Sequence, residues 1–250
     1  MKRELVVDFE VPKSKVTVIP FGINNTVPNT TLSSQGARQQ LGITNRDRAI
    51  LFFGNIAPYK GLEYLIDAFA QLVGRDRSYR LLIAGKPKGN ETSWRFIEQK
   101  MVAAGVWDHV IERIEYVPDE ETELYFKAAD VLVLLYTHIF QSGVLFLEYS
   151  FGLPAIAADV GELGQEIVEG ETGFVFEPRN PFDLAARIDI YFNSELFHGL
   201  EARRGDIKRF ANERYSWDKV ATITTAVYSR LFANLLRAGG EAALARNRPL

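Results

Sequence analysis

The feature that constrains this chain most is its regular alternation of short apolar runs with longer amphipathic runs. The run Asp130–Tyr136 is almost continuously apolar, which predicts a strand covered on both faces of its sheet. The run Leu62–Val73 instead places its apolar residues on one face of a helix. Alternation of these two kinds of run predicts an α/β fold, a single Rossmann-like domain whose parallel sheet is flanked by helices.

The same analysis extends along the chain. Residues Val16–Pro20 are rich in β-forming types, and strands are predicted at Arg48–Gly54, Tyr79–Gly85, within His109–Val117, and at Asp130–Tyr136, Ala155–Ala158 and Phe174–Phe176. Helices are predicted at Leu62–Val73, Thr92–Ala104, Pro118–Ala128, Gly143–Phe151, from Pro181 onward, and at Glu195–Arg209 and Trp217–Leu236. The polar segment Asn24–Gly42 predicts a loop that ends in about one helical turn. We therefore expect one domain over residues 1–236 and a frayed tail over 237–250.

Composition excludes several classes of site. The chain has no cysteine, so it has no disulfide and no thiolate metal site. Its three histidines, His109, His138 and His198, lack a ligand spacing, so we expect no metal. The formal net charge of −3 gives no reason to expect nucleic-acid binding.

The chain also lacks membrane signals. No window approaches 18 consecutive apolar residues, and the N-terminus lacks the apolar stretch of a signal peptide. We therefore expect no transmembrane segment and a cytoplasmic location, with a peripheral position at the inner membrane face left open.

The start of the predicted helix Gly143–Phe151 is a candidate anion site. Free backbone N–H groups and the positive end of the helix dipole attract phosphate, and Gly143 lets a ligand approach the backbone. Glu148 lies about one and a half turns further in, where a carboxylate could accept hydrogen bonds from sugar or ribose hydroxyls. The alternative is that Ser142 only caps a core helix and Glu148 lies on a solvated edge. The candidate residues here are His138, Gln141, Ser142, Gly143, Val144, Leu145 and Glu148.

Two further loops follow predicted strands. After the first strand, the segment from Gly54 and Asn55 delivers Lys60 just before a helix, where a lysine can neutralise a diphosphate. The second is the turn Glu115-Tyr116-Val117-Pro118, which follows a strand and precedes the acidic helix start Asp119–Glu123, and its backbone could hydrogen-bond a planar base. The alternatives are a lysine that merely starts a helix and an ordinary turn between a strand and a helix.

The usual fingerprints of other doubly wound enzymes are absent. The sequence contains neither GxGxxG nor GxxxxGK[ST], so the dinucleotide and P-loop interpretations lack their motifs. It also lacks the GxSxG nucleophile elbow.

Taken as a set, several segments resemble the carboxyl-terminal, donor-binding half of the family 4 (group 1) glycosyltransferases of the GT-B fold. The resemblance runs from Val16 to Phe232. It is carried by VTVIPFGIN, LFFGNIAPYKGLEYLIDAF, RLLIAG, YVPDEETELYFKAADVLVLL, QSGVLFLEYSFGLPAIAADVGELGQEIVEGETGFVF and YSWDKVATITTAVYSRL.

The resemblance implies a reaction and a set of roles. Members transfer a hexose from a nucleotide diphosphate sugar, here UDP- or GDP-hexose, to an acceptor hydroxyl with retention, and they need no metal or other cofactor. The residue matching Glu148 holds the ribose, and the residue matching Lys60 binds phosphate. Backbone N–H groups of Gly143, Val144 and Leu145 would meet the diphosphate, and the backbone of Val117 the nucleobase. The catalytic residues remain unknown.

Two positions depart from the family pattern. Phe140 stands where the family has a glutamate near the donor sugar, and Gln141 could take over part of that role because an amide both donates and accepts. Asn55 stands where the family often has an arginine, which leaves Lys60 as the only charge of its loop.

The chain also corresponds to only one of the two domains of such enzymes. It could be a fragment, a solitary domain or one part of a split enzyme. Trp217–Phe232 matches the terminal helix that packs toward the amino-terminal domain, so we expect it to expose an apolar patch.

Three interpretations remain open. The first is a donor-binding domain that transfers poorly alone and needs an amino-terminal GT-B domain, from a separate chain or a homo-oligomer. The second is a non-catalytic nucleotide-binding subunit or scaffold protein of the same fold. The third is a sugar-nucleotide epimerase or dehydrogenase, against which the missing dinucleotide motif argues.

Overall fold

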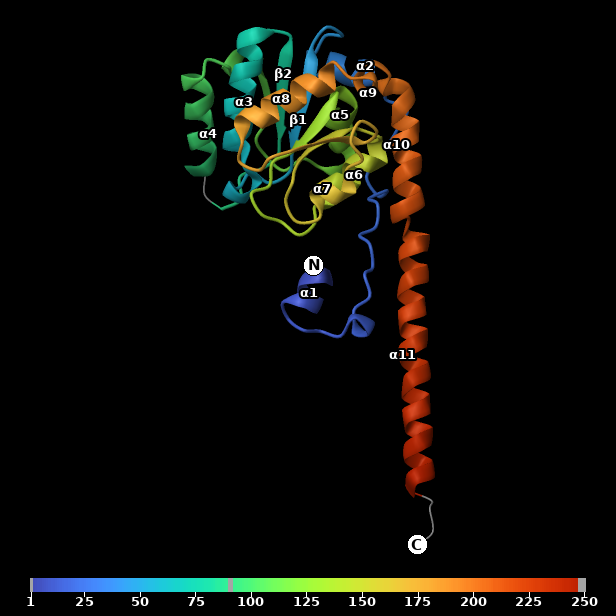
Figure 1. Ribbon diagram of the computed structural model, residues 1–250. Coiled ribbons are helices and arrows are strands. Elements are labelled where there is room, and N and C mark those ends of the chain that lie inside the picture. Colours follow the sequence, from blue (N-terminus) through green and yellow to red (C-terminus); the bar gives the residue numbers. More distant parts are fainter. Residues whose placement is uncertain (1, 90–91, 247–250) are drawn as a thin grey trace. The chain divides into compact units, whose positions relative to one another are not determined.

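The computed structural model describes residues 2–89 and 92–246 (Figure 1). The chain divides into two compact units. One unit is Ile23–Ala211, and the other combines Met1–Gly22 with Asn212–Leu250.

The larger unit contains a parallel sheet of six strands in the order β3-β2-β1-β4-β5-β6. The strands are β1 (Arg48–Phe53), β2 (Tyr79–Ala84), β3 (Val110–Arg113), β4 (Val131–Leu134), β5 (Ala155–Ala158) and β6 (Gly173–Phe176). The pairs β1–β2, β1–β4, β2–β3, β4–β5 and β5–β6 are all parallel. The sheet confirms the predicted α/β, Rossmann-like fold.

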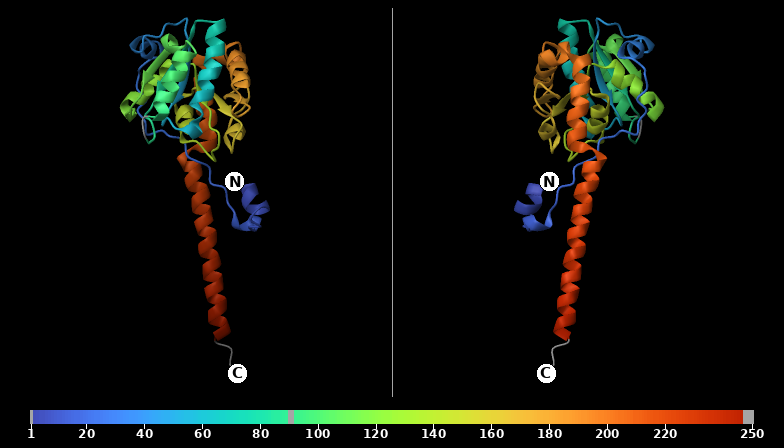
Figure 2. Two further views of the ribbon diagram at one scale, coloured as in Figure 1. Left: turned by 90° about the vertical axis from the view of Figure 1, so that its left-hand side faces the viewer. Right: turned by 90° about the vertical axis from the view of Figure 1, so that its right-hand side faces the viewer.

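Helices cover both faces of this sheet. They are α2 (Ser34–Gln40), α3 (Leu62–Arg75), α4 (Thr92–Ala103), α5 (Asp119–Ala128), α6 (Gly143–Phe151), α7 (Leu163–Glu166), α8 (Pro181–Phe192), α9 (Glu195–His198) and α10 (Leu200–Tyr215). Short 3-10 turns are η2 (Pro58–Lys60) and η3 (Trp107–His109). Helices α3, α4 and α8 pack together, as do α2, α5 and α6 (Figures 1 and 2). Right-handed crossovers place α3 and α4 on the face opposite α5 and α6.

The strand order reverses direction between β1 and β4. From β1 the chain moves outward to β2 and β3, and from β4 it moves the other way to β5 and β6. The carboxyl ends of β1 and β4 therefore flank a topological switch point, the place where open α/β sheets bind ligands.

The loops after β1 and β2 lie against each other at this edge. Gly85 has φ +152°, and a Cβ built on it would lie 1.8 Å from the carbonyl oxygen of Gly54. Backbone hydrogen bonds of 2.8 Å join Ile56 N–H to Lys86 O and Lys88 N–H to Ile56 O. The two loops therefore form one paired structure.

Helix boundaries differ from the predictions in two places of the larger unit. The predicted helix Glu195–Arg209 is two helices, α9 and α10, with Gly199 at the C-cap of α9 between them. The single turn predicted at the end of Asn24–Gly42 is the full helix α2, because Ser33 accepts a hydrogen bond from Gly36 N–H at 3.0 Å and caps it.

The smaller unit contains α1 (Lys2–Val7), η1 (Lys13–Lys15) and α11 (Trp217–Arg246). Residues Val16–Pro20 form no strand in the described chain; Val18 is 59% exposed there. β-forming residues alone do not make a strand, because a strand also needs a partner to bond its backbone. The division into a domain over 1–236 and a frayed tail stays a prediction, although the chain is helical as far as Arg246.

Helix α11 carries exposed apolar side chains, as expected: Trp217, Tyr228, Leu231, Phe232 and Leu235. Alanine, glutamate, leucine and arginine after Leu236 favour helix and extend it past the pair Gly239–Gly240. Over the described residues, no helix is both long and apolar enough to cross a membrane.

Candidate functional site

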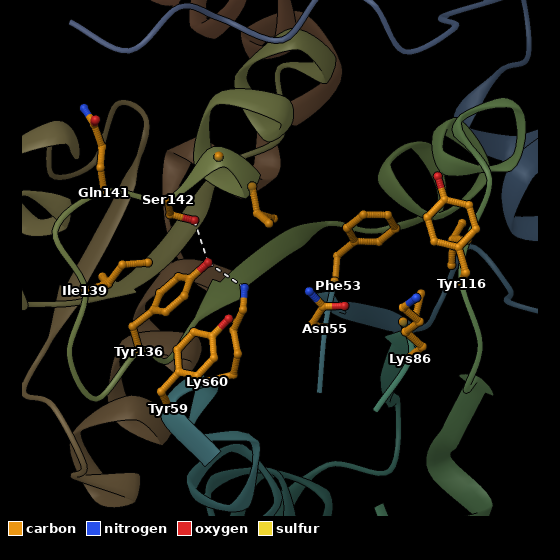
Figure 3. A pocket seen from close by; sticks show the side chains of 16 residues that line it. Phe53, Asn55, Tyr59, Lys60, Lys86, Tyr116, Tyr136, Ile139, Gln141 and Ser142 are labelled. Carbon is orange, nitrogen blue, oxygen red and sulfur yellow. Dashed lines mark hydrogen bonds between the residues drawn. The ribbon is translucent and has the colours of Figure 1, made fainter. Parts of the chain in front are cut away.

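A cavity of about 260 Å³ opens at the carboxyl edge of β1, β2 and β4 (Figure 3). Eight of the eleven predicted site residues line it: Gly54, Asn55, Lys60, Val117, Gln141, Ser142, Gly143 and Val144. The sheet topology explains this, because carboxyl ends of adjacent parallel strands meet at one edge.

Lys60 is the buried cation of the cavity. It ends the turn η2, and only 6% of its surface is exposed. Its Nζ donates to the Tyr136 hydroxyl at 2.5 Å and lies 4.2 Å from the centroid of that ring. Burial lowers the pKa of Lys60 to about 8, because a charged ammonium loses its hydration there. Lys60 is thus a cation that an anionic ligand would stabilise.

The N-terminus of α6 faces the same cavity. Its N-cap residue Ser142 does not cap the helix with its side chain. The Ser142 hydroxyl is instead 2.7 Å from the Tyr136 hydroxyl. The first-turn N–H groups at Gly143 and Val144 therefore receive no bond from the cap side chain, which leaves them suited to an anion. Ser142 thus stands at the N-cap of α6 without capping the helix through its side chain, and its role in binding stays a prediction.

Two predicted residues lie beside the cavity without lining it. His138 is exposed, and its ring lies 6.1 Å from that of Tyr59. Leu145 is fully buried, so only its backbone can take part in binding. Gln141 lines the cavity, but its side chain points away from Lys60 in Figure 3.

Glu148 is placed differently from both interpretations of the sequence. It is fully buried, not on a solvated edge, and it does not line the cavity. Neither carboxylate oxygen has a hydrogen-bond partner among the described residues. Helix α6 runs inward from the cavity, so a residue five positions past Gly143 lies about 7.5 Å deeper along the axis. The expected orientation toward a ligand is therefore not observed, and the ribose-binding role of Glu148 stays a prediction.

The surroundings of Glu148 belong to the interior. Burial raises its pKa well above the usual value, so the neutral acid is the favoured form. Burial raises the pKa of nearby Tyr191 well above its usual value, Asp130 and Glu148 raise it further, and Arg204 lowers it. The Tyr191 hydroxyl donates to the carbonyl oxygen of Asp130, at the amino end of β4.

We expect Glu148→Leu to raise the free energy of unfolding at pH 7 by about 1–3 kcal/mol, because it removes a buried polar group without a partner. The folded-state pKa of Glu148 is raised. The contribution of its carboxyl group to the free energy of unfolding is therefore fully present below the unfolded pKa of about 4.3, and it is lost as pH rises toward the folded-state pKa. Glu148→Gln removes this titration. Urea unfolding between pH 4 and 8 should therefore show the wild type losing stability relative to Glu148→Gln.

Parallel pH profiles for the wild type and Glu148→Gln would contradict this account. A severalfold loss of nucleotide affinity in Glu148→Leu, with stability unchanged, would support the ribose-binding role instead.

Eight residues that line the cavity were not among the predicted site residues, and Lys86, Tyr116 and Tyr136 are three of them. Lys86 follows Gly85 at the end of β2, the same signal that identified Lys60 after β1. Its Nζ lies 5.7 Å from the ring centroid of Tyr116, which is 63% exposed. Lys86 thus adds a second cation to the cavity from the loop after β2. Asn55, in the loop after β1, adds no charge.

Residues 33–212 match the family model described as glycosyl transferases group 1, which covers most of the chain. The chain belongs to this family.

Curated relatives of this family member are about twice its length. An uncharacterized glycosyltransferase of Methanocaldococcus jannaschii is 29% identical over 233 residues, covering 91% of this chain and 57% of the relative. A D-inositol 3-phosphate glycosyltransferase of Streptomyces avermitilis is 30% identical over 233 residues, covering 90% of this chain and 49% of the relative. The chain therefore spans about half the length of the curated relatives it matches.

Solved structures confirm the fold. Sucrose-phosphate synthase of Thermosynechococcus elongatus aligns with a TM-score of 0.77 at 23% identity, over 93% of this chain and 57% of the other. Anabaena HepE aligns with a TM-score of 0.74 at 20% identity, over 91% of this chain and 60% of the other. The C-terminal domain of LpcC from Francisella tularensis gives 0.61 at 21% identity, over 80% of this chain and 97% of that domain. The family member therefore has the fold of the carboxyl-terminal half of GT-B glycosyltransferases.

Proposed function

We propose that the chain is the donor-binding half of a retaining hexosyltransferase that uses a nucleotide diphosphate sugar. The observation that supports this most is the cavity in which buried Lys60 and the N-terminus of α6 lie together. A positive cradle of this kind stabilises a leaving diphosphate without a metal. A cytoplasmic location, with contact at the inner membrane face left open, is part of the proposal.

The lining of the cavity suggests where the two parts of the nucleotide sugar donor would bind. Lys60 and the N–H groups at Gly143 and Val144 would take the diphosphate. The backbone at Val117 would meet the nucleobase, on the side where Lys86 and Tyr116 also lie (Figure 3). UDP is the nucleotide to test first, because HepE, which shares the fold, was solved with UDP and with UDP-glucose.

A second candidate is a nucleotide-binding subunit without catalysis of its own. Phe140 favours it, because this residue is 59% exposed where the family has a glutamate, and a phenyl ring cannot bond a sugar hydroxyl. In either case the rest of the active-site cleft would come from an amino-terminal GT-B domain, in a separate chain or in a homo-oligomer.

Calorimetric titration of the folded chain tests the proposal. We expect saturable binding of UDP or GDP, and weaker binding of the matching monophosphate by about 10- to 150-fold. The reason is that one charge-assisted hydrogen bond contributes about 1.5–3 kcal/mol. Inorganic phosphate serves as the control for simple anion binding.

No saturable binding of either diphosphate by the folded chain would contradict the proposal. A partner chain that restores hexose transfer would favour the split enzyme, whereas a partner that does not would favour the subunit.

A further inference from the structure

Three buried polar side chains from different elements form one hydrogen-bonded chain at the cavity. Lys60 comes from η2, Tyr136 from the loop after β4, and Ser142 from the start of α6. Their exposed fractions are 6%, 2% and 1%. The links are Lys60 Nζ to the Tyr136 hydroxyl at 2.5 Å and that hydroxyl to Ser142 Oγ at 2.7 Å (Figure 3).

The chemistry of its members fixes one of the two directions. An ammonium only donates, so the Tyr136 oxygen accepts from Lys60. Either hydroxyl can donate in the bond between Tyr136 and Ser142, and we consider the arrangement in which Tyr136 donates to Ser142 Oγ. The Ser142 hydroxyl is then free to donate its proton elsewhere, and it does not cap α6. Lys60 and Ser142, at the two ends of this hydrogen-bonded series, thus present donors to one cavity. These donors are the remaining protons of the Lys60 ammonium and the Ser142 hydroxyl.

The Tyr136 loop is also fixed against the Lys60 segment by its backbone. Thr137 N–H donates to the Tyr59 carbonyl oxygen at 2.9 Å, and the rings of Tyr59 and Tyr136 stack with centroids 6.2 Å apart. Tyr136 therefore has the geometry of a fixed bridge.

Neutral groups alone support the Lys60 ammonium. Among the described residues, no carboxylate forms an ion pair with it, and only burial shifts its pKa. Beside Tyr136 itself, Tyr59 stacks on the Tyr136 ring, His138 and Lys88 lie against Tyr59, and Lys86 lines the same cavity. The Tyr136 hydroxyl keeps its proton at neutral pH, since burial raises its pKa to about 12. The charge is therefore left for a bound anion to balance.

We propose that Tyr136 is a positioning residue, whose hydroxyl holds the Lys60 ammonium and the Ser142 hydroxyl on the same diphosphate. This inference rests on the proposed function and names a residue that the family comparison does not. A purely structural tyrosine would contribute its ring to packing, and its hydroxyl would then not affect the charge of Lys60.

Tyr136→Phe separates these roles because it keeps the ring and removes the hydroxyl. Without an acceptor the ammonium is less stable, so Lys60 loses its proton at lower pH. We expect the affinity of Tyr136→Phe for UDP to be about tenfold lower than that of the wild type at pH 7.5. In titrations from pH 7 to 9.5, we also expect the loss of affinity with rising pH to begin at a lower pH than in the wild type. Above pH 7 the terminal phosphate of UDP has a constant charge, since phosphate titrates near pH 6.

Tyr191→Phe is the matched control, because it removes a buried hydroxyl bond at the opposite edge of the sheet. We expect it to lower stability but leave the pH profile of UDP affinity unchanged. Ser142→Ala tests the Ser142 end of the hydrogen-bonded series. We expect it to lower UDP affinity severalfold with little change in stability, since the Ser142 side chain does not cap α6. It also provides the test if Tyr136→Phe does not fold.

If folded Tyr136→Phe binds UDP with the affinity and pH profile of the wild type, this inference is overturned and the proposed function stays intact. Unchanged affinity in Ser142→Ala would overturn it equally if Tyr136→Phe fails to fold. Absence of UDP and GDP binding by the wild type would overturn the proposed function and this inference with it.

Discussion

Lys60→Met is expected to weaken UDP binding by about 10- to 150-fold while raising the stability of the free chain. The loss of affinity follows from one charge-assisted interaction with phosphate, about 1.5–3 kcal/mol. The gain in stability follows from burial, because the pKa of Lys60 falls to about 8 and each unit of depression costs the fold about 1.4 kcal/mol. Methionine has a similar length and no charge, so it removes the ammonium and keeps most of the side-chain volume.

The stability effect has a defined pH dependence. The folded-state pKa of Lys60 lies below the unfolded value, so the penalty is fully present below about pH 8 and disappears as pH rises toward 10.5. We expect the variant to be more stable than the wild type by about 1–3 kcal/mol at pH 7, and the difference to shrink at pH 10. Calorimetric titration and urea unfolding measure the two effects.

Lys88→Ala is the matched control for Lys60→Met. Lys88 is an exposed lysine near the same edge of the sheet, and it does not line the cavity. We expect less than a threefold change in UDP affinity and no change in stability. Equal losses of affinity in both variants would mean that the general positive field, not Lys60, binds the nucleotide.

Gly85→Ala is expected to have the largest effect on folding. A Cβ at this position would lie 1.8 Å from the Gly54 carbonyl oxygen, and a φ of +152° is unfavourable for any side chain. Backbone strain costs about 1–3 kcal/mol and overpacking about 1–3 kcal/mol more. A loss of about 2–6 kcal/mol is a large part of the stability of a typical domain.

Urea unfolding measures this loss, and Gly74→Ala provides its control. Gly74 lies in α3, and a Cβ added there would meet no atom within 4 Å, so alanine should stabilise the helix by about 1 kcal/mol. If Gly85→Ala instead remained within about 1 kcal/mol of the wild type, the loops after β1 and β2 would not be packed as closely as described.

The sequence predicts the sheet well because its strands carry local signals. Runs such as Asp130–Tyr136 are almost continuously apolar, which indicates a strand buried on both faces. The segment Val16–Pro20 carries a similar local signal without forming a strand, because strand formation depends on a partner far away in the chain. The break at Gly199 was missed because glycine within a helical pattern does not always end a helix.

The site was predictable where topology alone decides it. Gly54, Lys60 and Gly143 follow strands or begin a helix, so the sheet brings them to one edge. Depth along a helix is different, because spacing places Glu148 on a face but does not tell whether the side chain reaches the cavity or the core. Tyr136 was missed because its proposed role depends on contacts with the distant segment that holds Lys60, which no local pattern encodes.

The paired loops after β1 and β2 have a consequence for ligand affinity. Because Ile56 exchanges backbone hydrogen bonds with Lys86 and Lys88, the loops on the proposed phosphate side and the proposed base side of the cavity are expected to become ordered together. A ligand that orders the loop on one side therefore lowers the entropic cost of ordering the loop on the other side. A molecule that joins a base to a diphosphate should consequently bind more tightly than its two halves would suggest.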